Sequence, residues 1–439
     1  MKKSGYDMVL RGGRVIDPAL GFGKEASIFI KDGKIAKIVK EGKGTGRGHE
    51  KTAGGEIIDV TGMIVSPGLI DMHVHLREPG REDKETIITG CEAAAAGGFT
   101  SVCCMPNTFP AIDNQETVKF VLSRSEKARA RVYVVGAITK SLQGEELAEI
   151  GDLVKSGAVA ISDDGNYVQN PEIMRRALEY AKMFGIPIIT HAEDQFLCAG
   201  GVMNESYECS RLGLKGRPAV GEEIAVLRDI KLCQFVGGRL HIAHVTTTGA
   251  VQAIRQAKKD GVNVTAEACP HHFTLTDKEI GKEFDANLRM NPPLRTKKDV
   301  EGIIEGLVDG TIDCIASDHA PHSAEEKDVE FDQAPPGIIG LETTLGLVKT
   351  QLVDKGYLSW ADAIRKMTQN PARILGLPGG TLEEGSAADI TVIDPDKKWT
   401  VKREKFYSKS KNSPFIGWKL SGKVQYTILG GSVVYQAQG

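Results

Sequence analysis

The sequence predicts an α/β fold: a (β/α)8 TIM-like barrel with a small composite β-domain that the N- and C-terminal segments form together. Two observations predict it. Between about residues 67 and 374, strand-like runs alternate with segments of helix length, and eight such strands occur. At both ends of the chain the pattern is instead one of short β runs. The 439 residues suit a barrel of ~250 residues with insertions and an appended domain.

The two terminal segments are rich in β patterns and glycine turns. The first contains DMVLRGGRVID, ASIFIKDGKIAKIV and GEIIDVTGMIV, and the last contains ADITVIDPD, WTV and VQYTILGGSVVYQ. Neither segment is long enough to make a good core alone. We therefore expect residues 1–66 and 375–439 to pair into one composite β-sandwich domain, which leaves 67–374 for the barrel. The polar, glycine-rich stretch 41–55 is predicted to be a mobile hairpin loop.

The central segment supplies the barrel strands. These are the runs GLIDMHV, FTSVCCM, RVYVVGA, AVAIS, IPIITH, RLHIAHV, VNVTAEA and IDCIAS. Between most of them lie amphipathic segments of helical period, such as NPEIMRRALEYAKMFG and GAVQAIRQAKKDG. A doubly wound open sheet is the alternative, but eight regular repeats without a glycine-rich nucleotide turn favour the barrel.

Composition narrows the class of protein. The net charge of −3 does not indicate a nucleic-acid or anionic membrane partner, and no apolar stretch approaches the ~20 residues of a membrane span. The N-terminus MKKSGYDMVLRGG lacks the apolar core of a signal peptide. The eight cysteines are scattered without a CxxC pair, and Cys103 and Cys104 are expected to be buried rather than bridged. A reducing, cytoplasmic setting fits these features.

His73 and His75 end the first predicted barrel strand, within GLIDMHVHLREPG. Side chains two residues apart on a strand project to the same face, and the carboxyl end of a barrel strand is the active-site face. Taken alone, the pair fits two hydrogen-bonded core histidines as well as a metal site.

The ends of four further strands also carry acidic or imidazole side chains. These are Asp163 and Asp164 in AVAISDDG, His191 in IPIITHAED, His244 in RLHIAHVTTT and Asp318 in IDCIASDHAPH. Groups at these ends converge on the barrel mouth, and imidazole with carboxylate is a ligand set that suits zinc and related divalent metals. The sequence therefore predicts a metal centre. Spacing alone does not choose between Asp163 and Asp164.

The remaining histidines are predicted to lie outside this ligand set. His241 and His244 are three residues apart, so strand alternation allows only one of them to face the interior, and His244 lies nearer the mouth. His319 is expected to point away from its neighbour Asp318. Structural or solvated positions are expected for His49, His271 and His272.

Several motifs together resemble the dihydroorotase family of the amidohydrolase superfamily. They are DMHVHLREPG, MPNT, SDDG, HAED, NPPLR, SDHAPH, PPGIIGLET and KNSPFIGWKLSGKVQYTILGG, and they span essentially the whole chain. The HxH pair marks only the superfamily, whereas HVHLREPG with MPNT and SDHAPH is much narrower. The resemblance implies reversible cyclisation of N-carbamoyl-L-aspartate to L-dihydroorotate, a step of de novo pyrimidine biosynthesis.

The resemblance also implies the metal ligands. One zinc would be held by His73, His75 and Asp318, and a second by His191 and His244. Many relatives bridge two metals with a carboxylated lysine on strand four, but GAVAISDDG contains no lysine, and Lys155 is expected on the preceding helix. The chain thus resembles the group that uses an aspartate there, with Asp164 as the ligand and one or two zinc ions per subunit.

The implied chemistry is hydrolysis of a cyclic amide by metal-bound hydroxide. Zinc lowers the pKa of water to about 7 and polarises a carbonyl. Asp318 would accept the proton of the nucleophile and deliver it to the leaving ring nitrogen, which one carboxylate can do because the intermediate separates the two steps.

The substrate carries a carboxylate, and Arg77 follows His75 by two residues with a planar fork of donors that suits it. Further contacts with substrate are implied by position and resemblance together; they involve His75, Asn107, Asn291, His322, Pro336 and Gly337. The polar stretch 322–337 is predicted to be a mobile lid over the mouth.

Two alternatives stay open at this stage. Another cyclic-amide hydrolase, such as a hydantoinase or an allantoinase, uses the same metal chemistry, although its relatives usually carry the bridging lysine. A non-catalytic scaffold homologue would have lost metal ligands, and all of those expected are present. A homo-oligomer is expected, and the resemblance suggests aspartate carbamoyltransferase as a partner.

Overall fold

The protein is described by a computed structural model that covers residues 5–40 and 55–438. Its centre is a parallel sheet of eight strands in the order β15-β14-β13-β10-β9-β8-β7-β6. A further parallel bridge between Val74 and His319 joins the two edges, so that the sheet closes into the predicted barrel. The strands are β6 (Leu69–Val74), β7 (Phe99–Cys104), β8 (Arg131–Gly136), β9 (Ala158–Ser162), β10 (Ile188–Thr190), β13 (Leu240–Ile242), β14 (Val264–Ala268) and β15 (Cys314–Ile315).

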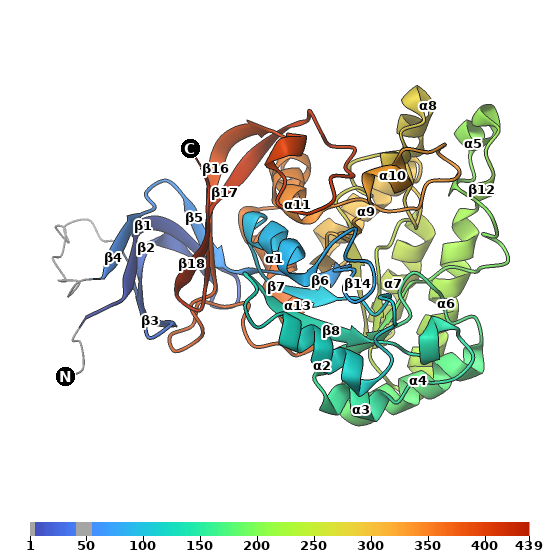
Figure 1. The fold of residues 1–439 in the computed structure, drawn as a ribbon, viewed down its shortest axis with the longest axis horizontal. Coiled ribbons are helices and arrows are strands. Elements are labelled where there is room, and N and C mark those ends of the chain that lie inside the picture. Colours follow the sequence, from blue (N-terminus) through green and yellow to red (C-terminus); the bar gives the residue numbers. More distant parts are fainter. Residues whose placement is uncertain (1–4, 41–54, 439) are drawn as a thin grey trace.

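Helices surround this barrel and join successive strands (Figure 1). They are α1 (Ile87–Ala96), α2 (Gln115–Arg124), α3 (Ile150–Lys155), α4 (Pro171–Phe184), α6 (Ala219–Val236), α7 (Thr248–Lys259), α9 (Lys297–Asp309), α11 (Leu341–Val348), α12 (Trp360–Met367) and α13 (Gln369–Leu375). The sequence predicted α4 well, because Asn170 caps its first turn, Pro171 begins it and Gly185 ends it with a left-handed φ of 69°. Lys155 lies on α3, as expected.

A second sheet combines both ends of the chain, in the order β18-β17-β16-β5-β1-β2-β3, with β4 paired to β1. The N-terminal strand β5 pairs antiparallel with the C-terminal strand β16, which places Pro67 opposite Ile390. Figure 1 shows the two groups of strands side by side at one end of the molecule. The strands are β1 (Met8–Asp17), β2 (Phe22–Lys31), β3 (Lys34–Lys40), β4 (Glu56–Asp59), β5 (Ile64–Pro67), β16 (Ile390–Thr400), β17 (Lys419–Leu429) and β18 (Ser432–Gln436).

The expected pairing of the two terminal segments into one sheet is therefore confirmed. The boundaries drawn at 66/67 and 374/375 and the description of this part as a sandwich remain predictions. The expectations for the stretch 41–55 and for His49 fall almost entirely outside the described residues.

Two apolar layers hold the barrel together. Its interior packs Ile70, Met72, Val135 and Ile189 against residues of α13, so the barrel is filled rather than hollow. A larger cluster fills the space between the strands and the surrounding helices. All eight cysteines are free and buried, and among them Cys103 and Cys104 are buried as expected. Among the described residues, no helix is both long and apolar enough to span a membrane.

Short elements follow several strands at the carboxyl end of the barrel. They are η1 (Lys140–Leu142), β11 (Met203–Asn204), α5 (Tyr207–Leu212), β12 (Gly216–Arg217), η2 (Asp277–Glu279), α8 (Ile280–Glu283), η3 (Ala286–Leu288) and α10 (Ala324–Lys327). Two others, η4 (Lys349–Val353) and η5 (Arg403–Lys405), lie near the second sheet. The insertions at the carboxyl end build the walls of the candidate site.

Candidate metal centre

Side chains from three strand ends meet at the mouth of the barrel. The Nε2 atom of His73 lies 3.2 Å from Asp164 Oδ1 and 3.6 Å from Asp318 Oδ1. The Nε2 atom of His75 lies 3.1 Å from Asp318 Oδ1 and 3.5 Å from Asp164 Oδ2. Both carboxylates therefore face both imidazoles, and they do so in a buried space.

The two remaining predicted ligands complete this cluster. His244 Nε2 lies 3.7 Å from Asp164 Oδ1, and the His244 ring centroid is 5.2 Å from that of His73. The ring of His191 lies 4.5 Å from the ring of His244. Within the cluster, ligand atoms of two triplets lie within 4.8 Å of one another: one is His73, Asp164 and His244, and the other is His73, His75 and Asp318.

Unsatisfied polar atoms at the centre of the cluster fit a bound cation. Among the described residues, His73 Nε2 and Asp164 Oδ1 are buried without a hydrogen-bond partner. Burial by itself would lower the pKa of His73, but the charges of Asp164 and Glu267 raise that pKa well above its ordinary value. Burial would raise the pKa of Asp164, yet the charge of His73 and the neighbouring imidazole of His244 lower it well below its ordinary value. The cluster therefore favours positive charge at its centre, which a divalent metal would supply.

Hydrogen bonds to the Nδ1 atoms orient both rings of the HxH pair. His73 Nδ1 lies 2.6 Å from Glu267 Oε1, and His75 Nδ1 lies 2.7 Å from Asn107 Oδ1. Because each acceptor favours a proton on Nδ1, each ring turns its Nε2 toward the cluster, where a neutral imidazole would offer the Nε2 lone pair to a metal. The other oxygen of Glu267 lies 3.2 Å from His241 Nε2. One buried carboxylate thus orients His73 and joins it to a neighbouring strand.

Left-handed backbone conformations re-aim side chains at the strand ends. The φ angles are 61° for Arg77, 29° for His244 and 48° for Asp318. This corrects the expectation that only one of His241 and His244 faces the interior. Alternation applies only along regular strand, and β13 ends at Ile242, so the side chain of His241 and the backbone of His244 both reach Glu267.

The two neighbouring aspartates after β9 point in different directions. Asp163 accepts hydrogen bonds from the backbone N–H of Ile138 (2.8 Å) and of Thr139 (3.0 Å), and from the Thr139 hydroxyl. Asp164 faces His73, His75 and His244. Asp163 therefore ties the β8 loop to β9, while Asp164 is the carboxylate available to a metal.

Arg77 lies close to the cluster with its guanidinium largely uncommitted. Its Nε donates to the carbonyl of Pro321 (3.1 Å), and within the described ranges its terminal nitrogens have no ion-pair or hydrogen-bond partner. Burial lowers the pKa of Arg77, opposed by the charges of Asp318 and Asp164. Its fork of donors is thus free to receive a substrate carboxylate.

The other predicted substrate contacts fall into two groups. The first group is the two asparagines. Asn107 contacts the cluster through its hydrogen bond with His75. The Asn291 side chain accepts a hydrogen bond from Arg217, which also forms an ion pair with Glu193 (3.0 Å). The second group is His322 with Pro336 and Gly337. His322 Nε2 lies 2.9 Å from the Pro336 carbonyl, and a Cβ built on Gly337 would lie 3.4 Å from the same nitrogen.

The stretch 322–337 includes α10, and several contacts attach it to the barrel. Glu326 pairs with Arg81 (2.9 Å) and Lys84 (2.7 Å), and it also lies 3.2 Å from His322 Nδ1. Lys327 donates to the carbonyls of Ala286 (3.0 Å) and Pro335 (2.7 Å). These ion pairs could hold or release the stretch as a unit; its predicted mobility stays a prediction.

The histidines placed outside the ligand set behave largely as expected. The side chain of His319 points to Glu85 (3.4 Å) rather than into the cluster. His272 Nε2 donates to the Pro292 carbonyl (3.0 Å), and burial lowers its pKa well below the ordinary value. Together with Cys269, His271 and His272 form a third buried group with metal-type donor atoms, which adjoins the centre without sharing a residue with it.

Sequence reasoning missed two buried carboxylates that support the centre. Glu267 orients His73, and Asp71 accepts from the backbone N–H of His73 (3.1 Å) and of Ser317 (3.1 Å). Each is an acidic residue within an apolar strand run, VNVTAEA or GLIDMHV. Because buried charge needs a partner, such a position in a predicted strand was the signal that could have found them.

Comparison with known proteins places this geometry in a family. The amidohydrolase family profile matches residues 64–434. A dihydroorotase from Pelotomaculum thermopropionicum is 54% identical over 429 residues, covering 98% of both chains. A dihydroorotase from Geobacter metallireducens is 51% identical, covering 98% of this chain and all of that one (100%).

Solved structures show the same architecture. An L-hydantoinase (dihydropyrimidinase) from Arthrobacter aurescens superimposes with a TM-score of 0.87 at 27% identity, covering 99% of this chain and 97% of its own. A dihydropyrimidinase from Brevibacillus agri shares the fold with a TM-score of 0.84 at 24% identity, covering 98% of this chain and 95% of its own. With its barrel, its clustered histidines and aspartates and these full-length similarities, the chain belongs to the amidohydrolase family and, within it, to the dihydroorotases.

Proposed function

We propose that this protein is a dihydroorotase that interconverts L-dihydroorotate and N-carbamoyl-L-aspartate. The observation that carries the proposal is the guanidinium of Arg77, whose terminal nitrogens have no partner among the described residues and lie beside a buried cluster of imidazoles and carboxylates. A substrate that is a cyclic amide and also bears a carboxylate needs a metal-binding cluster to open the amide and a guanidinium to bind the carboxylate. Relatives at 54% and 51% identity over nearly the whole chain support the same assignment.

We further propose that the cluster holds one or two zinc ions. The residues that would bind them are His73, His75, Asp164, His191, His244 and Asp318. When bound, zinc would lower the pKa of water to about 7 and polarise the amide carbonyl. Strand β9 contains no lysine, and Asp164 faces imidazoles of both predicted sets. This position supports the proposal that Asp164 replaces a carboxylated lysine between the two metal positions.

The protein's own groups would bind, orient and move a proton. Arg77 would fix the substrate carboxylate, and the Asn107 amide nitrogen, which has no partner in the described part of the chain, would assist it. His322 and the backbone at Pro336 and Gly337 would contact the ring from the lid side, and Asn291 would do so from the Arg217 side. The Asp318 carboxylate would hold the proton of the attacking water and pass it to the ring nitrogen.

Location and assembly are also proposals. We expect a cytoplasmic protein that forms homo-oligomers, and aspartate carbamoyltransferase as a partner enzyme. The apolar side chains of Val220, Ile224 and Leu227 support a docking surface, because they lie along α6 at helical spacing with exposures of 43%, 46% and 48%. We also keep the division into a 67–374 barrel and a composite 1–66/375–439 domain as a proposal.

The test of the activity is a substrate comparison with a matched arginine variant. Turnover of L-dihydroorotate, hydantoin, 5,6-dihydrouracil and allantoin is measured with the wild-type protein, with Arg77→Gln and with Arg255→Gln, an arginine on α7 far from the mouth. We expect L-dihydroorotate to be preferred, and Arg77→Gln to raise its KM about 10- to 150-fold, because a charge-assisted hydrogen bond is worth ~1.5–3 kcal/mol. Preference for hydantoin or dihydrouracil would contradict the assignment.

A further inference from the structure

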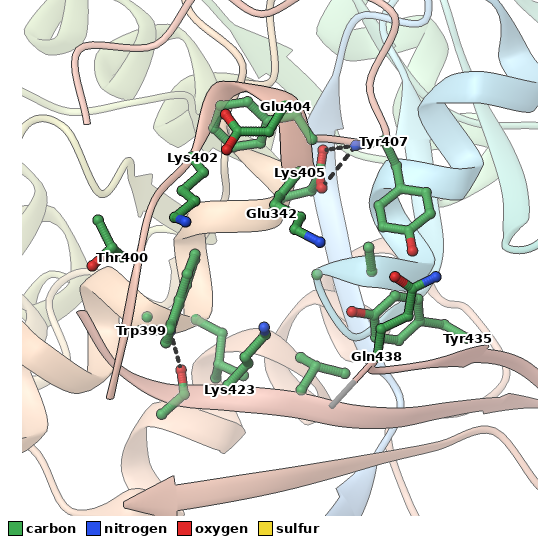
Figure 2. Close-up of a pocket in the computed structure, with 17 residues that line it drawn as sticks. Glu342, Trp399, Thr400, Lys402, Glu404, Lys405, Tyr407, Lys423, Tyr435 and Gln438 are labelled. Atoms are coloured by element: carbon green, nitrogen blue, oxygen red, sulfur yellow. Dashed lines mark hydrogen bonds between the residues drawn. The ribbon is translucent and has the colours of Figure 1, made fainter. Parts of the chain in front are cut away.

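A cavity lies away from the barrel mouth, where the barrel helices meet the second sheet. Its volume is about 430 Å³, and its walls come from the end of α1, from α11, from β16, β17 and β18, and from the turn η5 (Figure 2). None of the proposed metal ligands or substrate contacts lines it. A cavity of this volume is within the range that accepts a small molecule.

Three ammonium groups gather in this cavity without partners. Figure 2 shows the side chains of Lys402, Lys405 and Lys423 ending around the same open space. Within residues 5–40 and 55–438, none of the three amines has an ion-pair or hydrogen-bond partner, and Lys423 lies over the ring of Trp399 at 5.7 Å. Burial and the neighbouring charges of Lys397 and Lys405 lower the pKa of Lys423, as expected where positive charge is uncompensated.

The acidic groups of the wall do not neutralise these lysines. Glu404 is exposed at the rim, and the Glu342 carboxylate already accepts hydrogen bonds from the backbone N–H of Tyr407 (2.9 Å) and Ser408 (3.1 Å). Burial raises the pKa of Glu342 to about 7, so near neutral pH it carries only part of a negative charge. The cavity is therefore a net attractor of anions.

Aromatic side chains supply flat apolar walls beside the ammonium groups. Tyr407 and Tyr435 meet edge to face with their ring centroids 5.7 Å apart, and Trp399 stands on the opposite side of the space (Figure 2). Ammonium groups bind phosphate, and aromatic faces stack on planar bases. We propose that this cavity is an effector site for a ligand of the nucleoside phosphate class, with the phosphate on the three lysines and the base against the aromatic side chains.

A chain of hydrogen bonds connects this cavity to the barrel mouth. Glu342 holds the backbone of Tyr407 and Ser408, and the Ser408 hydroxyl and the Lys409 N–H both donate to Glu85. Glu85 in turn contacts His319, whose carbonyl accepts from the N–H of His75 (2.9 Å). A ligand that shifts the 402–409 segment would therefore change the hydrogen bonds that position His75. We expect occupancy of the cavity to alter the rate of turnover at the barrel mouth.

The test measures binding by calorimetry with the complete, metal-loaded protein. The probes are AMP, UMP and inorganic pyrophosphate, and the variants are Lys402→Gln, Lys423→Gln and Tyr435→Leu, with Lys259→Gln, an exposed lysine at the end of α7, as the control. We expect each cavity-lysine variant to weaken nucleotide binding at least tenfold, and the control to leave it unchanged. Tyr435→Leu should weaken the binding of AMP or UMP but leave the binding of pyrophosphate unchanged.

The outcomes separate the parts of the proposal. Absence of binding by all three probes at millimolar concentration, or equal binding by wild type and Lys423→Gln, would overturn the site. Pyrophosphate binding that equals or exceeds nucleotide binding would overturn the base contact. The same samples are assayed for turnover: a change in kcat or KM on nucleotide addition, lost in Lys423→Gln, supports the effector role, and unchanged kinetics at saturation overturn it.

Discussion

Asp318 and His75 come from opposite ends of the barrel sheet, yet their side chains approach to 3.1 Å. Although burial opposes it, the hydrogen bond from His75 and the surrounding imidazole charges lower the pKa of Asp318 below its ordinary value. An ionised carboxylate at this point can accept a proton from water. The ionised form is the one that the proposed proton-transfer role of Asp318 needs.

At this residue, Asp318→Asn should reduce turnover about 10²- to 10⁴-fold while retaining part of the bound metal, because asparagine keeps an oxygen ligand but cannot carry the proton. Steady-state rates and metal content per subunit are measured on the same sample. Near-normal turnover would remove Asp318 from the proton-transfer role.

The neighbouring aspartates should respond in opposite ways. Asp164→Ala should lower metal content strongly, since it removes a group that faces three imidazoles. Asp163→Ala should instead keep the metal and lower the free energy of unfolding by about 2–4 kcal/mol, because it leaves the buried N–H groups of Ile138 and Thr139 without their acceptor. Metal analysis and thermal unfolding decide, and the reverse order would mean that the ligand is Asp163.

Glu342 provides a pH-dependent contribution to stability. Its folded-state pKa is raised to about 7, so its favourable contribution is complete below the unfolded value of about 4.5 and is lost as the pH rises through 7. Glu342→Gln cannot ionise and still accepts N–H hydrogen bonds. The free energy of unfolding of this variant should therefore rise relative to wild type by ~1–1.5 kcal/mol between pH 6 and 8.

The control for this measurement is Glu305→Gln, an exposed glutamate on α9. Its difference from wild type should stay constant over the same pH range. A Glu342→Gln difference that is equally flat would show that Glu342 does not titrate between pH 6 and 8.

At the scale of elements, α10 is a short helix whose position depends on ion pairs more than on packing. None of its four residues, Ala324–Lys327, is buried, and Glu326 connects it to Arg81 and Lys84. Exposed and partly exposed pairs contribute ~1 kcal/mol or less each, so the segment is held only weakly.

Glu326→Ala should therefore speed amide hydrogen exchange in 322–337 and raise the KM for dihydroorotate several-fold, whereas the exposed neighbour Glu325→Ala should do neither. Exchange is followed by mass spectrometry of peptides from this stretch. If Glu326→Ala and Glu325→Ala give the same exchange, then the ion pairs of Glu326 do not hold the segment.

The elements were largely predictable, and the reasons are local. All eight barrel strands were found, because short apolar runs with flanking turns alternate regularly with helical periodicity. Same-face spacing and strand ends also predicted which residues gather at the mouth. The opposite orientations of Asp163 and Asp164 were not predictable from spacing, because they depend on backbone donors of another loop.

Other parts of the site depend on contacts that no local pattern encodes. The positive φ of His244 broke the alternation rule, and the link between Glu267, His241 and His73 joins three different strands. The lysine-lined cavity also could not be predicted from the sequence, because Glu342 and Lys423 become neighbours only when the C-terminal strands pack on the barrel helices.

At the scale of the whole molecule, the second sheet ties both ends of the chain to the barrel. Thr391 on β16 donates to the Gly98 carbonyl (2.6 Å), and Thr427 on β17 donates to the Ala95 carbonyl (2.6 Å). The C-terminal segment also provides Ser408 and Asn412, which hold Glu85 and the Gly337 carbonyl near the mouth. The terminal segments thus support the site as well as the fold.

The central claim is that the cluster at the barrel mouth binds metal and that this metal is required for turnover. The direct test removes metal from the protein with a chelator, adds zinc stepwise, and measures bound zinc per subunit and dihydroorotate turnover at each step. The account predicts negligible turnover without metal and a rate that rises in proportion to bound zinc until one or two equivalents are bound. Full turnover by metal-free protein, or zinc binding that leaves the rate unchanged, would contradict it.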